Sequence, residues 1–320
     1  MNKKEKIILF GASRGGENFI KHNKTQYDIL AIADNDEKRW GSLLEGLKVI
    51  NPKDILKYDF DNIYITSQWV DSIIYQLTED FKIPLEKIKI PKKSSLKESF
   101  KPFEHVETLK FARESLCKIT QFLSNHNIIA IVDSGTALGI VRDKDLIKWD
   151  DDIDFAIDSK DFEKLISLVD GLRTILPKNE YSKWKLEVIS LSNEDVCLSL
   201  ELQSSDLNML KEFEISLQKR TIKDGLSHLD SSAGIFYAPA LHFEKYERVD
   251  FFDGFAYLPY KVDDFLTFMY GNYKEPKKDT SIENYDNRVV QKKRNIKSFD
   301  VSKRVILYTL LPLCIFLNYT

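Results

Sequence analysis

Cysteine is scarce in this sequence. Its 320 residues include three, Cys117, Cys197 and Cys314, which lie far apart and show no CxxC or other metal-ligand spacing. This scarcity excludes a disulfide framework and a zinc module, and it is typical of proteins that work in a reducing compartment. We expect each thiol to be a small buried residue.

An excess of charge of one sign is also missing. Lys and Arg together number 47, Asp and Glu together number 50, and the net charge at pH 7 is −3. Because phosphate contacts supply most of the affinity for nucleic acid, a chain without a general basic field is expected to have no nucleic-acid partner. The content of 43% apolar and 30% charged residues is that of a soluble globular chain with about two domains.

Stretches that are apolar enough to enter a membrane are short. The apolar run before Gly11 has only four residues, too few for a signal peptide, so we expect a cytoplasmic chain. The one membrane candidate, residues 305–317, is interrupted by Pro312, and a spanning helix needs about 20 apolar residues. It follows a basic stretch, which favours peripheral contact with the inner face of a membrane. A terminal helix docked on its own domain is the alternative.

Alternating apolar runs and turns over residues 1–90 predict an α/β, Rossmann-like domain. The strand-like segments KIILF, DILAIAD and NIYITS are separated by helical stretches. Buried strands joined by helices indicate a parallel, doubly wound sheet. Residues 91–103, with two prolines, three serines and four lysines, are predicted to be a linker.

Residues 104–290 predict a second domain, of the mixed α+β class. Apolar residues at three/four spacing predict a helix from Glu104 to about Ser124. A strand at 128–132, a strand at VCLSLELQ and a helix at VDDFLTFMYG are expected to follow. Residues 291–320 form a basic and apolar C-terminal tail.

A glycine-rich turn is the first candidate site. Gly11 and Gly16 enclose a turn between a predicted strand and a predicted helix, which is the context of the dinucleotide fingerprint G-x-G-x-x-G. Ser13 occupies the middle position, so a nicotinamide oxidoreductase is disfavoured. Asp34 ends the second predicted strand, where an acidic residue binds ribose hydroxyls. The three residues predict a nucleotide or nucleotide-sugar pocket, and a structural tight turn is the alternative.

A run of aspartates is the second candidate site. Asp150, Asp151, Asp152 and Asp154 follow Trp149 directly. If residues 152–158 form a strand, its two-residue period puts Asp152 and Asp154 on one face, about 7 Å apart. Hard carboxylate ligands favour Mg²⁺ or Mn²⁺, and a bound cation removes the repulsion among the acids. A solvated acidic turn is the alternative.

Three residues upstream and one downstream complete this site. Gly135 and Thr136 lie between a predicted strand and a short helix, so backbone N–H groups there are candidates for holding a phosphate. Arg142 is the candidate donor to that phosphate, and a surface ion pair is its alternative. Glu201, in the alternating segment SLELQ, is the candidate third metal carboxylate, with a solvent-facing acid as the alternative.

Two segments resemble known families. The stretch GTALGIVRDKDLIKWDDDIDFAID (135–158) resembles the signature of the LicD/fukutin family, and residues 253–276 are similar to that family's closing segment. The resemblance implies a nucleotidyltransferase-like fold. It also implies transfer of a phosphorylated alcohol, such as phosphocholine or a polyol phosphate, from a CDP-linked donor to a cell-surface glycan. The first ninety residues look like half-Rossmann domains appended to bacterial sugar-modifying enzymes.

The resemblance also implies roles for individual residues. Gly135 and Thr136 match the phosphate-side turn, and Arg142 matches the motif arginine. The matching acids are the preceding, catalytic pair Asp150 and Asp151 and the metal ligands Asp152 and Asp154. Asp145 and Lys148 depart from the family pattern. Both lie in the connecting loop, so they bear on which donor or acceptor is used more than on the metal site. Two alternatives stay open: nucleotidyl transfer onto a sugar phosphate, and a non-catalytic module that binds nucleotide or metal.

Overall fold

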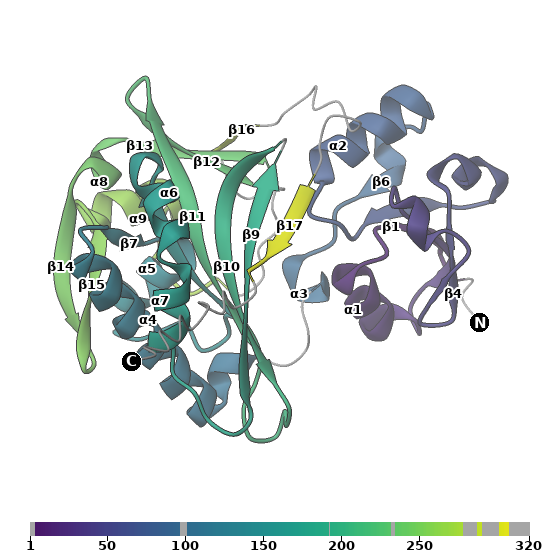
Figure 1. Cartoon of the computed structure of the whole chain (residues 1–320). Coiled ribbons are helices and arrows are strands. Elements are labelled where there is room, and N and C mark those ends of the chain that lie inside the picture. The colour runs from purple at the N-terminus through teal and green to yellow at the C-terminus, as the bar shows by residue number, and fades with distance from the viewer. Residues whose placement is uncertain are drawn as a thin grey trace, which may run out of the picture.

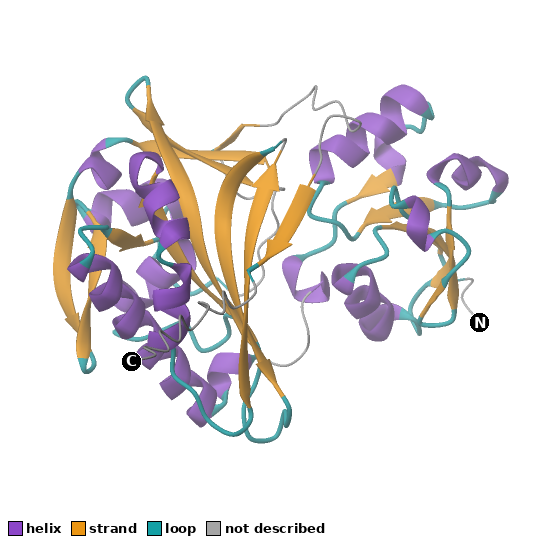
Figure 2. Ribbon diagram, viewed as in Figure 1, coloured by secondary structure: helices purple, strands orange, loops and turns teal. Residues whose placement is uncertain are grey.

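The chain folds around two separate β-sheets. The structure, a computed structural model, describes residues 4–96, 101–191, 193–231, 234–277, 287–289 and 301–306. Residues 4–96, the first unit, carry a six-stranded sheet, and the described residues from 101 onward, the second unit, carry an eleven-stranded sheet (Figure 1). Each sheet has helices of its own beside it (Figure 2).

The first unit has the strand order of a doubly wound fold. Its strands are β1 (Lys6–Phe10), β2 (Asp28–Ala33), β3 (Leu43–Leu44), β4 (Leu47–Ile50), β5 (Asn62–Ile65) and β6 (Ile88–Lys89). The order is β3-β4-β2-β1-β5-β6, and every neighbouring pair is parallel except β3 with β4. The chain therefore runs outward from β1 in both directions, as in a Rossmann half, and the predicted parallel α/β sheet is confirmed.

Strand β1 shows why this sheet is parallel and buried. Ile8 and Phe10 belong to one core cluster and Ile7 and Leu9 to another, and all four are at most 1% exposed. The strand therefore has apolar side chains on both faces, as a sheet covered by helices on each side requires. Its helices are α1 (Arg14–Asn23), α2 (Val70–Tyr75) and α3 (Lys93–Leu96).

The predicted linker is anchored at both ends. Asn18 donates a side-chain hydrogen bond to the carbonyl of Leu96, which packs against the core of the first unit. Phe103, at the other end, is 1% exposed and lies in the core of the second unit. Residues 97–100 lie outside the described part of the chain.

The second unit has a mixed sheet. Its strands are β7 (Ala130–Val132), β8 (Asp152–Asp158), β9 (Ser182–Leu191), β10 (Glu194–Ser204), β11 (Phe213–Lys223), β12 (Leu226–Ser231), β13 (Gly234–Pro239), β14 (Tyr246–Phe251), β15 (Gly254–Pro259), β16 (Arg288–Val289) and β17 (Val301–Val305). The main path is β14-β15-β7-β8-β11-β10-β9-β17, and β12, β13 and β16 continue from β11. Strands β8 and β11 are parallel, whereas β7 with β8 and β10 with β11 are antiparallel.

Helices gather beside the central strands of this sheet (Figures 1 and 2). They are α4 (Val106–Asn125), α5 (Ser134–Arg142), α6 (Phe162–Ser167), α7 (Val169–Ile175), α8 (Leu241–Glu244) and α9 (Val262–Tyr270). Leu116, Ile119 and Leu123 of α4 are fully buried in one cluster with Ile153 and Phe155 of β8. The apolar stripe on α4 is therefore core, and the predicted helix from Glu104 to about Ser124 is confirmed within two residues.

The C-terminal tail contributes a strand to the second sheet. Strand β17 pairs antiparallel with β9, with Val301 opposite Leu191 and Val305 opposite Glu187. The predicted domain end at residue 290 is therefore wrong, because residues 301–305 satisfy the backbone groups of an otherwise open edge. Residues 307–320, with most of the segment expected at a membrane surface, lie outside the described residues. In the part of the chain that is described, no helix has the length and apolar character to cross a membrane.

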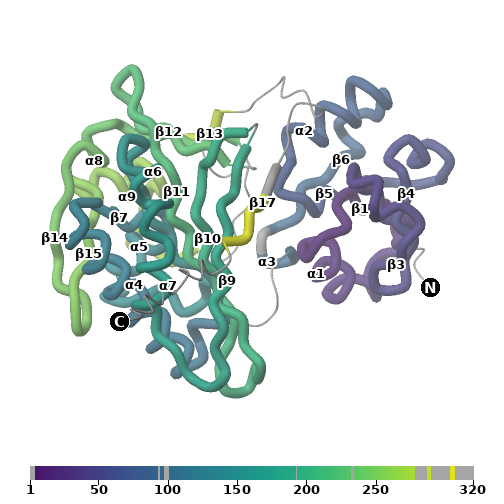
Figure 3. The backbone as a smooth tube through the Cα atoms, viewed as in Figure 1, coloured from purple at the N-terminus to yellow at the C-terminus, as the bar shows by residue number. Residues whose placement is uncertain are grey.

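One buried ion pair joins the two units. Arg288 of β16 lies 2.8 Å from Asp71 of α2, and their side chains are 7% and 11% exposed. Figure 3 shows α2 on the side of the first unit that faces β12 and β13.

Candidate functional site

The site is built where strand β7 ends and helix α5 begins. Asp133 is the N-cap residue of α5, and its carboxylate accepts a hydrogen bond of 2.7 Å from the backbone N–H of Ser134. Ser134 has a φ of +50°, which a non-glycine residue rarely adopts. Backbone strain of this kind persists where the surrounding structure enforces it and is concentrated at functional sites.

The turn is fastened directly to the aspartate strand. The backbone N–H of Asp154 donates to the Thr136 hydroxyl at 2.9 Å, and the N–H of Asp133 donates to the carbonyl of Asp154 at 2.9 Å. The structure therefore brings the predicted phosphate turn and the predicted acidic strand together. The Thr136 hydroxyl itself holds β8 in place.

Gly135 lets an acid approach the turn closely. A Cβ atom at this position would lie 2.6 Å from Oδ2 of Asp150, closer than any real contact. The absence of a side chain at Gly135 thus sets the position of the Asp150 carboxylate.

Replacing Gly135 with alanine is therefore expected to displace the Asp150 carboxylate with little change in fold. Misplacing a reacting group by about 1 Å can cost about a hundredfold in rate. The helix should gain about 0.5–1 kcal/mol, because alanine is the better helix former. Turnover and urea unfolding of the variant measure the two effects.

Gly171→Ala is the matched control for this change. Its Cβ would lie 2.6 Å from the ring of Phe122, in α4 rather than at the acids, so stability should change and turnover should not. Equal turnover of Gly135→Ala and wild type would contradict the role given to the close approach.

Three aspartates converge beyond this turn. Asp150, Asp151 and Asp152, here called the acidic cluster, each offer a carboxylate oxygen within 4.8 Å of the others, and all three are partly exposed. Carboxylates so close repel one another, and a divalent cation between them removes the repulsion. The donor set is all oxygen, which fits Mg²⁺ or Mn²⁺.

The cluster differs from the predicted pair of metal ligands. Strand β8 begins at Asp152, and the fully buried Ile153 and Phe155 lie on its opposite face, as the two-residue period predicts. Asp154, however, accepts a hydrogen bond of 2.7 Å from the side chain of Gln218. Asp150 and Asp151 precede the strand, so the loop can turn them toward Asp152. The two-residue period of a strand cannot predict where a loop before the strand places its side chains.

Glu214 of strand β11, and not the predicted Glu201, is the neighbour of Asp152 in the sheet. In the parallel pair of β8 and β11, Asp152 is opposite Glu214, and Glu201 is opposite Glu214 in β10. Glu201 is thus two strands from Asp152, about 10 Å away at strand spacing, and lies 3.7 Å from Lys185. Glu214 is exposed and accepts a hydrogen bond of 2.5 Å from Ser199. Alternation in FEISLQK marks Glu214 as a strand acid, but only the sheet order reveals its neighbour.

Arg142 forms an ion pair with a neighbouring acid, and its predicted contact with a donor phosphate stays a prediction. Its guanidinium makes two hydrogen bonds of 2.7 Å to the carboxylate of Asp143. The guanidinium also lies 5.5 Å from the ring centre of Trp149, the residue before the acidic cluster. Arg142 therefore stabilises the loop that carries the acidic cluster. Two of the N–H groups of its guanidinium bind Asp143.

A buried ion pair that the sequence does not reveal supports the turn. Arg220 of β11 donates to the Asp133 carboxylate at 2.7 Å and 2.6 Å, and the two side chains are 2% and 3% exposed. The Arg220 guanidinium also lies 4.2 Å from the ring centre of Phe243. The partners are 87 residues apart in the chain, so no local pattern connects them.

The glycine-rich turn of the first unit is closely packed. Gly11 has a φ of +122°, and a Cβ at Gly16 would lie 2.2 Å from the Gly11 carbonyl oxygen. The Asp34 carboxylate accepts hydrogen bonds from the backbone N–H groups of Ala12, at 2.6 Å, and Asp36, at 2.8 Å. These contacts fit the structural tight turn, and the nucleotide pocket at Gly11, Gly16 and Asp34 stays a prediction.

The two described thiols are not poised for nucleophilic chemistry. Burial raises the pKa of the Cys117 thiol to about 11, and burial also raises the pKa of the Cys197 thiol. Both are therefore protonated at neutral pH, and a thiolate is the form that attacks. Cys314 lies outside the described residues.

Two family models match parts of the chain. Residues 3–89 match a family described as C2185-like, N-terminal, and residues 127–187 match LicD/FKTN/FKRP, nucleotidyltransferase domain. The second match spans the turn, the acidic cluster and β8, and it supports the LicD resemblance of the motif. No curated protein matches the chain in sequence.

Similarity to solved structures is weak. UDP-D-quinovosamine 4-dehydrogenase from Vibrio fischeri is 17% identical over 28% of this chain and 79% of its own, with a TM-score of 0.24. An oxidoreductase from Agrobacterium radiobacter is 12% identical over 80% of both chains, also with a TM-score of 0.24. Biliverdin reductase from Synechocystis sp. PCC 6803 is 9% identical over 87% of this chain and 94% of its own, again at 0.24. Likenesses this weak carry no argument, so the Rossmann-like description of the first unit rests on its strand order.

Proposed function

We propose that the second unit is a metal-dependent transferase that moves a phosphorylated alcohol from a CDP-linked donor to a hydroxyl of a cell-surface glycan. The observation that carries the proposal is the convergence of Asp150, Asp151 and Asp152 beside the strained turn at Ser134. The LicD match supports an enzyme of a phosphotransferase family that modifies glycans. The glycan acceptors we expect are lipopolysaccharide, teichoic acid or capsule precursors.

Different residues would bind the metal, hold β8 in place and contact the donor phosphate. Asp150, Asp151 and Asp152 would hold Mg²⁺, which when bound neutralises the negative charge of the donor phosphates. Thr136 keeps β8, and with it Asp152, at a fixed distance from the turn. Backbone N–H groups at the start of α5 are the candidate contacts for a donor phosphate.

We assign Glu214 as the acid that receives the proton of the attacking hydroxyl. The hydroxyl oxygen forms a bond to the phosphorus that carries the alcohol, the bond from that phosphorus to the bridging oxygen breaks, and CMP leaves. Two observations support Glu214: it is exposed, and it is in register with Asp152 on the neighbouring strand. A general base must lie within hydrogen-bond reach of the proton that it takes.

Nucleotidyl transfer onto a sugar phosphate is the second candidate. The description of the matched family as a nucleotidyltransferase domain favours it. The mass of the product separates the two reactions, because the acceptor gains either an alcohol phosphate or a nucleotide.

Incubation of the full chain with Mg²⁺, a panel of CDP-alcohols and a glycan acceptor tests the proposal. We expect CMP release with at least one donor, loss of release with EDTA, and recovery when Mg²⁺ is returned. Metal-independent release, or no consumption of any donor, would contradict the proposed reaction and favour a binding module.

A further inference from the structure

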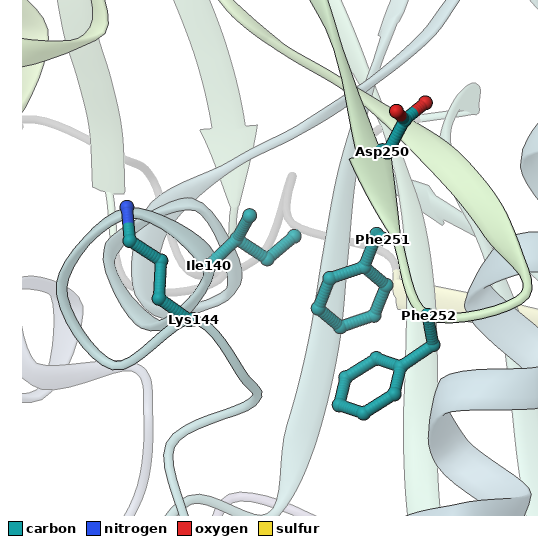
Figure 4. Close-up of a pocket in the computed structure, with 5 residues that line it drawn as sticks. All are labelled: Ile140, Lys144, Asp250, Phe251 and Phe252. Carbon is teal, nitrogen blue, oxygen red and sulfur yellow. The ribbon is translucent and has the colours of Figure 1, made fainter.

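A small cavity lies at the far end of α5 from the acidic cluster. It has a volume of about 160 Å³ and is lined by Ile140, Lys144, Asp250, Phe251 and Phe252. Ile140 and Lys144 lie on one side, at the end of α5, and the two phenylalanine rings lie on the other, at the turn between β14 and β15 (Figure 4). Ile140 comes six residues after Ser134, which is about 9 Å along the helix axis.

Two residues that line this cavity have a strained backbone. Lys144 has a φ of +57° and Phe252 a φ of +47°. For a bulky residue the left-handed region is a true outlier, and glycine fits it without strain. A phenylalanine and a lysine thus occupy positions at the cavity where glycine would fit with less strain.

The Phe252 ring is held firmly and still accessible. The guanidinium of Arg113 lies 4.1 Å from the centre of this ring, and Arg113 in turn donates to Asp145 at 2.8 Å. The Phe251 ring packs against it at right angles, with ring centres 4.8 Å apart. Phe252 is nevertheless 53% exposed. Asp145 is one of the two residues that depart from the family pattern. It holds Arg113, and Arg113 in turn positions the Phe252 ring.

The charges around the rings select the ligand. Lys144 and Arg113 repel a cationic head group such as choline, and Asp250, which lies 3.8 Å from Arg248, repels a phosphate or other anion. An uncharged ring with hydroxyl groups fits both. Its C–H face can pack on the aromatic ring of Phe252, while its hydroxyls can accept from Lys144.

We propose that this cavity binds a sugar ring of the acceptor glycan. The inference rests on the proposed transferase function and names where the acceptor is held. A glycan that occupies the cavity extends along α5 toward the acidic cluster, so the cavity sets which sugar is modified.

Phe252→Gly tests this assignment, because it removes the ring and also relieves the positive φ. Saturation-transfer NMR of the full chain with a panel of methyl glycosides, without donor, measures sugar binding directly. We expect wild type to bind at least one glycoside and Phe252→Gly to bind it at least fivefold more weakly, with an unchanged or higher melting temperature. Phe268→Ala is the control, since Phe268 is a 42%-exposed phenylalanine on α9 away from the cavity. It should bind as wild type does.

Two results would overturn the assignment: wild-type binding by Phe252→Gly, or no binding of any glycoside by wild type. Equal loss in Phe268→Ala would also overturn it, because the effect would then not belong to the cavity. CMP release by wild type from a CDP-alcohol is scored separately. If CMP is released but Phe252→Gly still binds sugar, the cavity assignment alone fails. If sugar binding depends on Phe252 but no donor is consumed, the transferase function alone fails.

Discussion

Asp152→Asn is expected to lower the rate of transfer about a hundredfold to a thousandfold while the chain stays folded, since losing one group that stabilises transition-state charge costs about 2.7–4 kcal/mol. Asp152 is the member of the acidic cluster that belongs to strand β8, so it links the loop acids to the sheet. The fold should survive because Asp152 is partly exposed. In addition, removing one of three neighbouring like charges relieves their repulsion.

Thermal melting with and without Mg²⁺ measures the binding part of this prediction. A cation at a hundred times its dissociation constant stabilises wild type by about 2.7 kcal/mol, and Asp152→Asn should lose most of that gain. Glu163→Gln, an exposed acid on α6, is the control and should respond to Mg²⁺ as wild type does. Wild-type turnover in Asp152→Asn would remove the acidic cluster from the mechanism.

Arg220→Met is expected to destabilise the chain by about 3–5 kcal/mol, because it leaves the buried Asp133 carboxylate without its partner. The ion pair lies almost completely out of water. Since Asp133 also caps α5, its unpaired charge would be relieved by opening the turn, and the acidic cluster would lose its support. Turnover should therefore fall together with stability.

Urea unfolding of Arg220→Met, Asp133→Asn and the double variant separates the contributions. The double variant should be less destabilised than the sum of the single variants, because neither charge is then left alone. Arg304→Met breaks an exposed pair with Asp195 at 3.3 Å and is the control, with an expected loss of at most about 1 kcal/mol. Additive losses in the double variant would mean that Arg220 and Asp133 act independently.

Local patterns in the sequence predict much of this fold. The strand at 152–158 and the helix before it follow from side-chain periods of two and of three to four, which neighbours in the chain determine. The parallel, doubly wound sheet of the first unit follows in the same way from alternating strands and helices. The glycine and threonine of the turn are recognisable because they precede a helix.

The details of the site depend on contacts between distant segments. Glu214 rather than Glu201 lies beside Asp152 because β11 is inserted between β8 and β10, and no local pattern contains that order. Arg220 reaches Asp133 from the same inserted strand. The face of the strand predicts Asp154 as a metal ligand, and this stays a prediction; the hydrogen bond from Gln218 of β11 to one of its oxygens could not be predicted. The position of β11 in the sheet, which the sequence does not predict, accounts for all three of these contacts.

The return of the chain as β17 bears on how the protein is prepared. A shortened version that stops at residue 290 would uncover the five residues of β9, 187–191, that pair with β17, and would leave their N–H and C=O groups on that side without partners. Such an edge is a template for pairing between molecules and promotes aggregation. Truncations intended for crystals or assays should retain residues through 306.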